Sequence, residues 1–124
     1  LDAGSVYKAG ELLKSIIVAS ANDSCVAMAE YLSGSVDSFV DSMNTRAQAL
    51  GLSDSNFINC TGLPAPGQYC CAHDAAVMMR SLIKHPLFFE YAGVWMFDFV
   101  HPGGRVTGLT NTNRMIRTYT GCDG

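Results

Sequence analysis

The most constraining feature of the chain is a helical pattern that stops at Ser20 and resumes directly after Asn22. Apolar residues before the break recur at positions i, i+3, i+4, i+7 and i+8, which predicts an amphipathic helix. They are Ala9, Leu12, Leu13, Ile16 and Ile17. A second stripe follows the break and ends before Gly34, where glycine can take the left-handed conformation that closes a helix. The break therefore predicts a polar turn between two helices.

Three further helices are expected downstream. Ser35 is a suitable N-cap for a third helix, and Gly51 is suited to end it. Its apolar stripe consists of Val36, Phe39, Val40, Met43, Ala47 and Leu50. A fourth stripe predicts a helix over residues 72–84, with Asp74 in a first turn where its charge favours the helix dipole. Pro86 can then open a short fifth helix through Tyr91.

Two segments are not helical in pattern. Residues 52–71 lose periodicity and are rich in Ser, Asn, Gly and Pro, which predicts a long loop of the kind that often has a function. Residues 94–100 and 105–109 flank a Pro-Gly-Gly turn and predict one β-hairpin. Trp95, Phe97 and Phe99 alternate along its first strand, which indicates a packed face. Because two strands alone expose their edges, this hairpin is expected to have neighbouring strands or to self-associate.

Composition limits the class of protein. The chain has 124 residues, of which 48% are hydrophobic, enough for one domain with its own core over residues 1–124. The net charge is −3, and the eight Lys and Arg residues are scattered, which argues against a nucleic-acid partner. No apolar run is long enough to span a bilayer.

The cysteines do not follow the spacing of a zinc site. There are five, an odd number, so at least one cannot pair within the chain. Cys70 and Cys71 are adjacent, and His73 is a poor substitute for a second ligand pair. No metal is therefore predicted, and the cysteines are interpreted as small hydrophobic residues or as thiols kept in a reducing setting.

Ser20, Ala21 and Asn22 match the S-x-N element of the penicillin-recognising serine enzymes, whose other signatures are S-x-x-K and K-T-G. The chain around this element resembles the serine D-alanyl-D-alanine carboxypeptidases over nearly its whole length and in the same order. The resemblance is carried by the helix before the turn, an N-F-x-N-x-x-G-L loop, and N-T-N and G-x-D-G segments near the end. These segments are residues 7–23, 56–64, 111–115 and 120–124.

The resemblance implies an α+β fold of about five helices plus a short hairpin, part of the penicillin-binding and β-lactamase-like fold. It implies a hydrolase that trims peptidoglycan stem peptides ending in D-Ala-D-Ala through an acyl-enzyme, with β-lactam antibiotics as further ligands and no cofactor. Ser20 would help to pass a proton to the leaving D-alanine, and Asn22 would hold the substrate's peptide group. The expected location is the bacterial cell envelope, with membrane association through segments outside this chain.

Two of the three family signatures are not matched. Ser5 to Lys8 spells S-x-x-K but lies only fifteen positions before Ser20, whereas the family nucleophile lies several tens of residues before S-x-N. We therefore interpret this match as accidental and expect the chain to be an internal, inactive fragment of the enzyme. A serine β-lactamase fragment remains an alternative, as does a helical binding module in which Ser20 and Asn22 are only helix caps.

Other polar residues are given structural roles. Asp23 is interpreted as a first-turn acid of the second helix. The three histidines, His73, His85 and His101, are expected at the surface or in loops. Asn111 and Asn113 are expected to form hydrogen bonds at the end of a strand. Gln68 and Cys71 stand where the resembled family often has a histidine and a hydroxyl residue, so the anchoring of the loop and the cap of the fourth helix are expected to differ.

Overall fold

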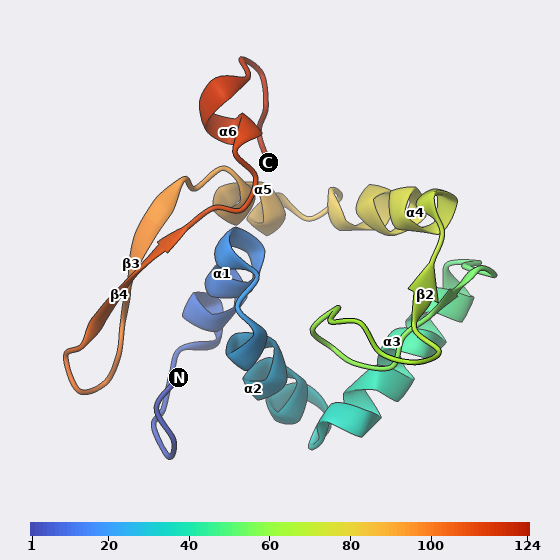
Figure 1. Ribbon diagram of the computed structural model, residues 1–124, viewed down its shortest axis with the longest axis horizontal. Coiled ribbons are helices and arrows are strands. Elements are labelled where there is room, and N and C mark those ends of the chain that lie inside the picture. Colours follow the sequence, from blue (N-terminus) through green and yellow to red (C-terminus); the bar gives the residue numbers. More distant parts are fainter. The chain divides into compact units, whose positions relative to one another are not determined.

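The computed structural model describes residues 1–124 and divides them into two compact units (Figure 1). The first unit contains Leu1–Met28 and His85–Gly124, and the second contains Ala29–Lys84. Six helices and two antiparallel strand pairs confirm the predicted α+β class with mainly helical content. None of the helices combines the length and the hydrophobicity that crossing a membrane requires.

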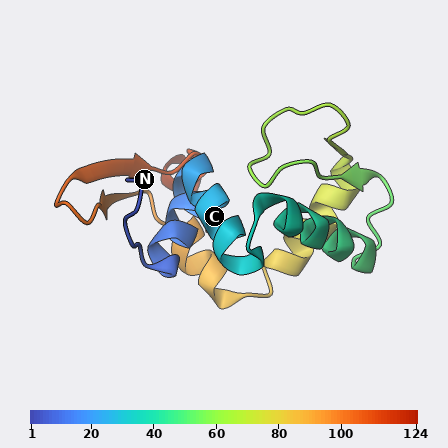
Figure 2. The ribbon, with the colours of Figure 1, turned by 90° about the horizontal axis from the view of Figure 1, so that it is seen from below.

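The first unit is built around α1 (Ala9–Ala19), which packs against α5 (Pro86–Ala92) and against both strands of a hairpin (Figures 1 and 2). The hairpin consists of β3 (Met96–Val100) and β4 (Val106–Thr110), paired in antiparallel register with Phe99 opposite Thr107. The buried apolar residues of the first unit are Leu12, Val18, Ala92 and Phe99. The hairpin therefore presents one face to α1, as the alternation of aromatic residues predicts.

The outer face of the hairpin remains exposed. Met96 and Val100 on β3 are 60% and 62% accessible, and Val106 on β4 is 54% accessible. On the inner face, the Lys14 ammonium of α1 lies 4.3 Å from the centre of the Phe97 ring. The two faces thus differ in packing although both carry apolar residues.

Helix ends follow the expected signals. The helix α2 (Asn22–Ser33) is followed by Gly34 with φ of 79°, in the left-handed region where glycine carries no steric cost. The next helix, α3 (Val36–Ala49), begins behind Ser35, whose hydroxyl accepts a hydrogen bond from the Ser38 N–H. A sixth helix, α6 (Met115–Thr118), exceeds the predicted five because a single turn is too short to show helical periodicity.

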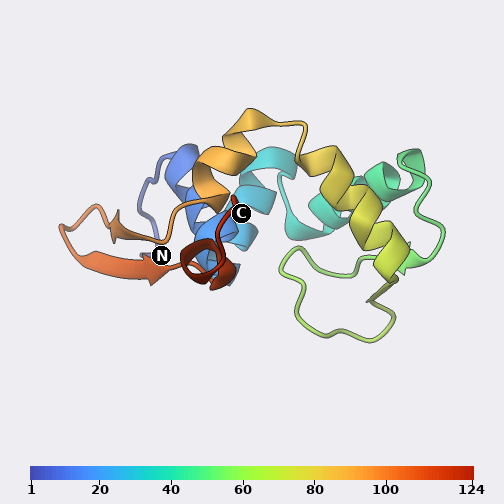
Figure 3. The same ribbon diagram turned by 90° about the horizontal axis from the view of Figure 1, so that it is seen from above.

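In the second unit, α3 contacts β1 (Ser55–Asn56), which pairs with β2 (Tyr69–Cys70) at the base of the long loop (Figure 3). The chain then enters α4 (Ala72–Leu82), close to the predicted boundaries. Buried apolar residues of this unit are Ala29, Val40, Ala47 and Leu52. The strand pair was not predicted, because two residues per strand are too few for an alternating pattern.

Candidate functional site

The turn between α1 and α2, residues 20–22, has the most unusual backbone of the chain. Ser20 has φ of 54° and ψ of 43°, and it is the only residue other than glycine with a positive φ. Its N–H donates to the carbonyls of Ile16 and Ser15, which closes α1. A left-handed conformation costs an L-residue roughly 1–2 kcal/mol. The predicted turn is therefore present, and it holds its serine in a conformation that a glycine would adopt at lower cost.

Two buried hydroxyl groups, one from each flanking helix, stabilise this turn. Ser15 of α1 and Ser24 of α2 are each 1% exposed, and their Oγ atoms lie 2.7 Å apart. The Ser15 Oγ also lies 2.8 Å from the carbonyl oxygen of Leu12. Buried hydroxyls need such partners to offset the cost of leaving water. The pair consequently joins the two helices at the point where the chain reverses.

The side chains of Ser20 and Asn22 are available to an external partner. Both residues are exposed, Asn22 being the first residue of α2, and neither side chain forms a hydrogen bond within the chain. Asp23, the next residue, lies in the first turn of α2 as predicted. The turn thus offers a hydroxyl and an amide to solvent from two fixed backbone positions.

The segment after β4 lies against the end of α1. The Thr112 N–H donates to the carbonyl of Val18 at 3.0 Å, two residues before Ser20. Asn111 is buried, and its amide donates to the carbonyls of Ala92 and Val94, both at 2.9 Å. Its Oδ1 accepts the N–H of Asn113 at 2.8 Å. These contacts confirm the predicted strand-end role of the two asparagines and bring the N-T-N segment beside the 20–22 turn.

A cavity of about 170 Å³ lies between the start of α2 and the hairpin. Ala21 and Ser24 line it on one side, and Phe99 and Thr107 line it on the other. Ser20 and Asn22 are not among its lining residues. Only the middle residue of the turn faces this cavity, so the two predicted site residues are available outside it.

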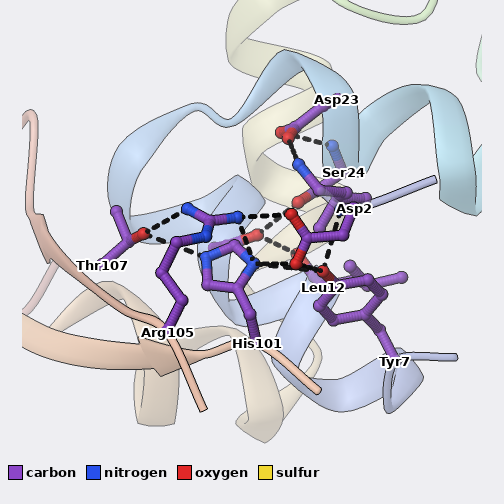
Figure 4. Close-up of polar contacts among 10 residues, drawn as sticks. Asp2, Tyr7, Leu12, Asp23, Ser24, His101, Arg105 and Thr107 are labelled. Atoms are coloured by element: carbon purple, nitrogen blue, oxygen red, sulfur yellow. Dashed lines mark hydrogen bonds and ion pairs between the residues drawn. The ribbon is translucent and has the colours of Figure 1, made fainter. Parts of the chain in front are cut away.

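His101 and Arg105 also line this cavity, and a polar network surrounds the His101 ring (Figure 4). The ring is buried, its Nδ1 lies 2.8 Å from Arg105 Nη2 and 3.0 Å from the Tyr7 hydroxyl, and its Nε2 lies 2.9 Å from Thr107 Oγ1. Because a guanidinium can only donate, Nδ1 accepts and the imidazole proton is assigned to Nε2. His101 lies in the loop between β3 and β4, within the predicted surface or loop positions, but its ring is buried because partners from the N-terminal segment and from the hairpin satisfy both ring nitrogens. His73 and His85 are exposed as predicted.

An aspartate completes the network. The carboxylate of Asp2 accepts from Arg105 Nη2 at 2.7 Å and from the Tyr7 hydroxyl at 3.2 Å. The Arg105 hydrogen bond holds the pKa of Asp2 below its ordinary value of 3.8, against a smaller opposing effect of burial. The sequence showed no signal for this network, since its members are up to 103 positions apart.

The local S-x-x-K match does not have the geometry of a catalytic pair. Ser5 is exposed and lies outside any helix. Lys8 is the N-cap of α1, with an extended backbone at φ of −73° and ψ of 131°. Residues three apart face each other when both lie on one helix. The structure therefore supports our interpretation of this match as accidental.

In the second unit, side chains fix the 52–71 loop. The Asn44 amide of α3 donates to the carbonyl of Phe57 at 2.8 Å and accepts its N–H at 2.9 Å. Gln68 Oε1 accepts the N–H groups of Ile58 and Asn59, at 3.0 and 3.1 Å. Cys71 caps α4, with its sulfur accepting the Asp74 N–H at 3.4 Å. The two departures from the resembled family therefore still provide a loop anchor and a helix cap.

Comparison with protein families and with individual proteins agrees with this arrangement. The family model described as D-alanyl-D-alanine carboxypeptidase (Peptidase_S11) matches residues 1–124. The chain is 40% identical over 124 residues to the D-alanyl-D-alanine carboxypeptidase DacF of Bacillus subtilis, covering all of this chain and 32% of that protein. It is 41% identical over 92 residues to DacC of Escherichia coli, covering 74% of this chain and 23% of that protein. The chain thus spans less than a third of the length of both relatives.

Solved structures give the same result. Penicillin-binding protein 5 from Haemophilus influenzae superimposes with a TM-score of 0.86 at 32% identity, over 94% of this chain and 33% of that one. Penicillin-binding protein 6B from Escherichia coli superimposes with a TM-score of 0.78 at 35% identity, over 89% of this chain and 33% of that one. The predicted membership of the penicillin-binding fold is confirmed.

Proposed function

Because the chain belongs to the D-alanyl-D-alanine carboxypeptidase family, we propose that it forms the S-x-N part of a serine-type D-Ala-D-Ala carboxypeptidase. The reaction removes the terminal D-alanine of peptidoglycan stem peptides through an acyl-enzyme, which water then hydrolyses. The nucleophilic serine, the lysine beside it and the K-T-G strand belong to segments that this chain does not contain. By itself, the chain is expected to be inactive.

In this mechanism Ser20 and Asn22 have different roles. The Ser20 hydroxyl hydrogen-bonds the lysine of S-x-x-K and relays a proton to the nitrogen of the leaving D-alanine. The Asn22 amide binds the peptide group of the substrate and holds its carbonyl in line for attack. Both roles need exposed side chains without competing partners, and both residues meet this requirement.

The observation that carries the proposal is the conformation of Ser20. A non-glycine residue in the left-handed region is a strained position, and such positions cluster at functional sites. A helix cap alone does not account for it, because the Ser20 side chain forms no capping bond and glycine would close α1 more favourably. Retaining a hydroxyl there is consistent with a chemical role.

The proposal is tested in a protein that carries this chain together with S-x-x-K and K-T-G segments. Ser20→Ala should lower the rates of acylation by fluorescent penicillin and of D-alanine release by about 10²–10⁴-fold, because proton transfer is lost. Asn22→Ala should weaken substrate binding more than it slows the chemical step.

Two serines serve as controls. Ser35→Ala removes a true cap and should cost about 1 kcal/mol of stability without lowering the acylation rate.

Ser5→Ala is the second control and should leave acylation unchanged. Loss of labelling in Ser5→Ala with normal labelling in Ser20→Ala would overturn the assignment and make the local S-x-x-K match the nucleophile. Rapid turnover of the bound penicillin, with no release of D-alanine from peptide, would instead indicate a serine β-lactamase. Unchanged labelling and peptide hydrolysis in both Ser20→Ala and Asn22→Ala would leave only the structural role of a helical module.

The same proposal extends to partners and location. Peptidoglycan lies outside the cytoplasmic membrane, so the enzyme would act in the bacterial cell envelope, held at the membrane by segments beyond this chain. The hairpin would pair with further strands there. In the isolated chain, its exposed Met96, Val100 and Val106 should favour association with a second copy. Sedimentation of the wild-type chain and of Val100→Lys tests this self-association. If both proteins sediment as monomers, association through the hairpin is excluded.

A further inference from the structure

Three potential metal ligands converge at the start of α4, in the second unit. The Sγ of Cys71, one imidazole nitrogen of His73 and one carboxylate oxygen of Asp74 all lie within 4.8 Å of one another. Thiolate, imidazole and carboxylate are the ligand types that zinc prefers, and the ligand atoms of a tetrahedral zinc site lie roughly 3–4 Å apart, from bonds of about 2.0–2.3 Å. The limit of 4.8 Å is wider than this spacing, so the side chains would have to move closer together to hold one ion.

The sequence did not predict this cluster. Adjacent Cys70 and Cys71 do not match paired-cysteine motifs, and His73 has no second histidine at a typical spacing. The structure uses a different set, with a cap cysteine at position 71 and residues 73 and 74 in the first helical turn. A second cysteine is not needed for a three-ligand site, because Asp74 supplies the third ligand.

Asp74 is held in the orientation that a ligand needs. Its Oδ2 accepts the Ser55 hydroxyl at 2.8 Å and the Asp54 N–H at 3.0 Å, while its Oδ1 lies 3.2 Å from His73 Nδ1. Metal-ligating carboxylates are commonly fixed by such hydrogen bonds to the oxygen that does not bind the ion. Oδ1 is left facing the imidazole, and an ion between them would replace a single hydrogen bond by two coordinate bonds.

The remaining two ligands lie at the start of α4, where Cys71 is partly exposed and His73 is open to solvent. Cys71 Sγ accepts the Asp74 N–H at 3.4 Å, a bond that a metal thiolate can keep. His73 is 80% exposed, so an ion can enter without opening the fold. The positive end of the α4 dipole opposes a cation, but the thiolate and the carboxylate supply two negative charges against it.

We propose that Cys71, His73 and Asp74 bind a divalent transition-metal ion of the zinc type, with water in the fourth position. Binding releases the thiol proton, because the ligand is the thiolate, and it requires the neutral form of the His73 imidazole. The bound ion would link the N-cap of α4 to its first turn. The proposal does not rest on the catalytic role of Ser20, because metal binding has its own readout.

Cobalt provides that readout. The chain, reduced with a phosphine that does not bind metals and freed of metal by chelation, is titrated with Co²⁺ alone and then with Zn²⁺. We expect one equivalent of Co²⁺ to give a thiolate-to-cobalt charge-transfer band, and Zn²⁺ to abolish it. Cys71→Ser keeps a good N-cap and should remove the band.

Graded variants distinguish this site from binding by other thiols. Since loss of a supporting hydrogen bond typically costs 10–100-fold in metal affinity, Ser55→Ala should weaken binding by about that factor. His73→Gln should weaken it at least as much. Cys70→Ser and Cys122→Ser are the matched controls and should keep the band. Circular dichroism of each variant establishes that α4 remains folded.

Two results would overturn the proposal. A charge-transfer band that survives in Cys71→Ser would assign the metal to other cysteines. Equal loss of the band in Cys70→Ser and Cys71→Ser, with no effect of His73→Gln, would indicate a cysteine pair instead of the three-residue site.

Discussion

The 20–22 turn and the 52–71 loop solve the same problem, a reversal of the chain, by different means. The turn is closed by main-chain bonds from Ser20 and by the buried pair of Ser15 and Ser24, all within ten residues. The loop is held mainly by side chains that reach across sequence, such as Asn44 to Phe57 and Asp74 to Ser55. The turn therefore leaves its polar side chains available, while the loop is held by its own side chains and by those of the flanking helices α3 and α4.

This difference distinguishes two roles that a polar residue can have, one in the fold and one in binding. Asn59 bonds the N–H groups of Thr61 and Gly62 and the carbonyl of Leu63, so its amide has little capacity left for a ligand. Asn22 has an amide of the same chemistry and no partner within the chain. An asparagine that folds the chain and one that is open to substrate are thus distinguished by their hydrogen bonds and not by their type.

The largest structural effect should come from removing the paired hydrogen bonds by which Asn44 holds the loop. Asn44→Ala removes two hydrogen bonds and leaves the Phe57 N–H and carbonyl without their partner, which should cost about 2 kcal/mol of unfolding free energy. Urea unfolding measures the loss, and hydrogen exchange should rise across residues 57–67. Gln48→Ala, at an exposed position of the same helix, should change stability by less than about 0.5 kcal/mol. Equal effects of the two variants would show that the clamp does not hold the loop.

The next effect concerns the support of the turn. Ser24→Ala removes one of the two paired hydroxyls and should cost about 1 kcal/mol. The double variant Ser15→Ala with Ser24→Ala should cost less than the sum of the single changes, because neither hydroxyl is then left alone. Ser42→Ala, an exposed hydroxyl on α3, is the control. Strict additivity would mean that the two hydroxyls do not stabilise each other.

A smaller effect of opposite sign is expected at Ser20. Ser20→Gly relieves the left-handed strain but adds chain entropy to the unfolded state, so the net gain should be about 0.5–1 kcal/mol. Ser20→Ala retains the strain and should leave stability nearly unchanged. Thermal unfolding of the three proteins, with acylation measured alongside, separates stability from chemistry. Destabilisation by glycine would show that the Ser20 side chain itself holds the turn together.

The same contrast explains what the sequence could predict. Helix periodicity and caps are local, so α1 to α5 and the exposed turn at Ser20 and Asn22 followed from the residues themselves. The contact of His101 with Tyr7 and the convergence of Asp74 on Ser55 depend on segments that are distant in sequence. Arg105 is only four positions from His101, but Tyr7 is 94 positions away, so the sequence does not suggest a network that joins them. Long-range side-chain bonds are therefore the part of this molecule that pattern analysis cannot reach.

The smallest effect should be electrostatic and depend on pH. Arg105 lowers the pKa of Asp2 below 3.8, so the pair stabilises the folded state above that pH, and the contribution is lost as the pH falls through the folded-state pKa. Asp2→Asn should therefore lower the melting temperature slightly at neutral pH, and the difference from wild type should shrink below pH 3.8. Because both side chains are about half exposed, added salt should shrink the difference as well. In an Arg105→Gln background the Asp2→Asn change should lose most of this pH dependence. A difference that persists there would assign the effect to Tyr7 and His101 in place of the Asp2 and Arg105 pair.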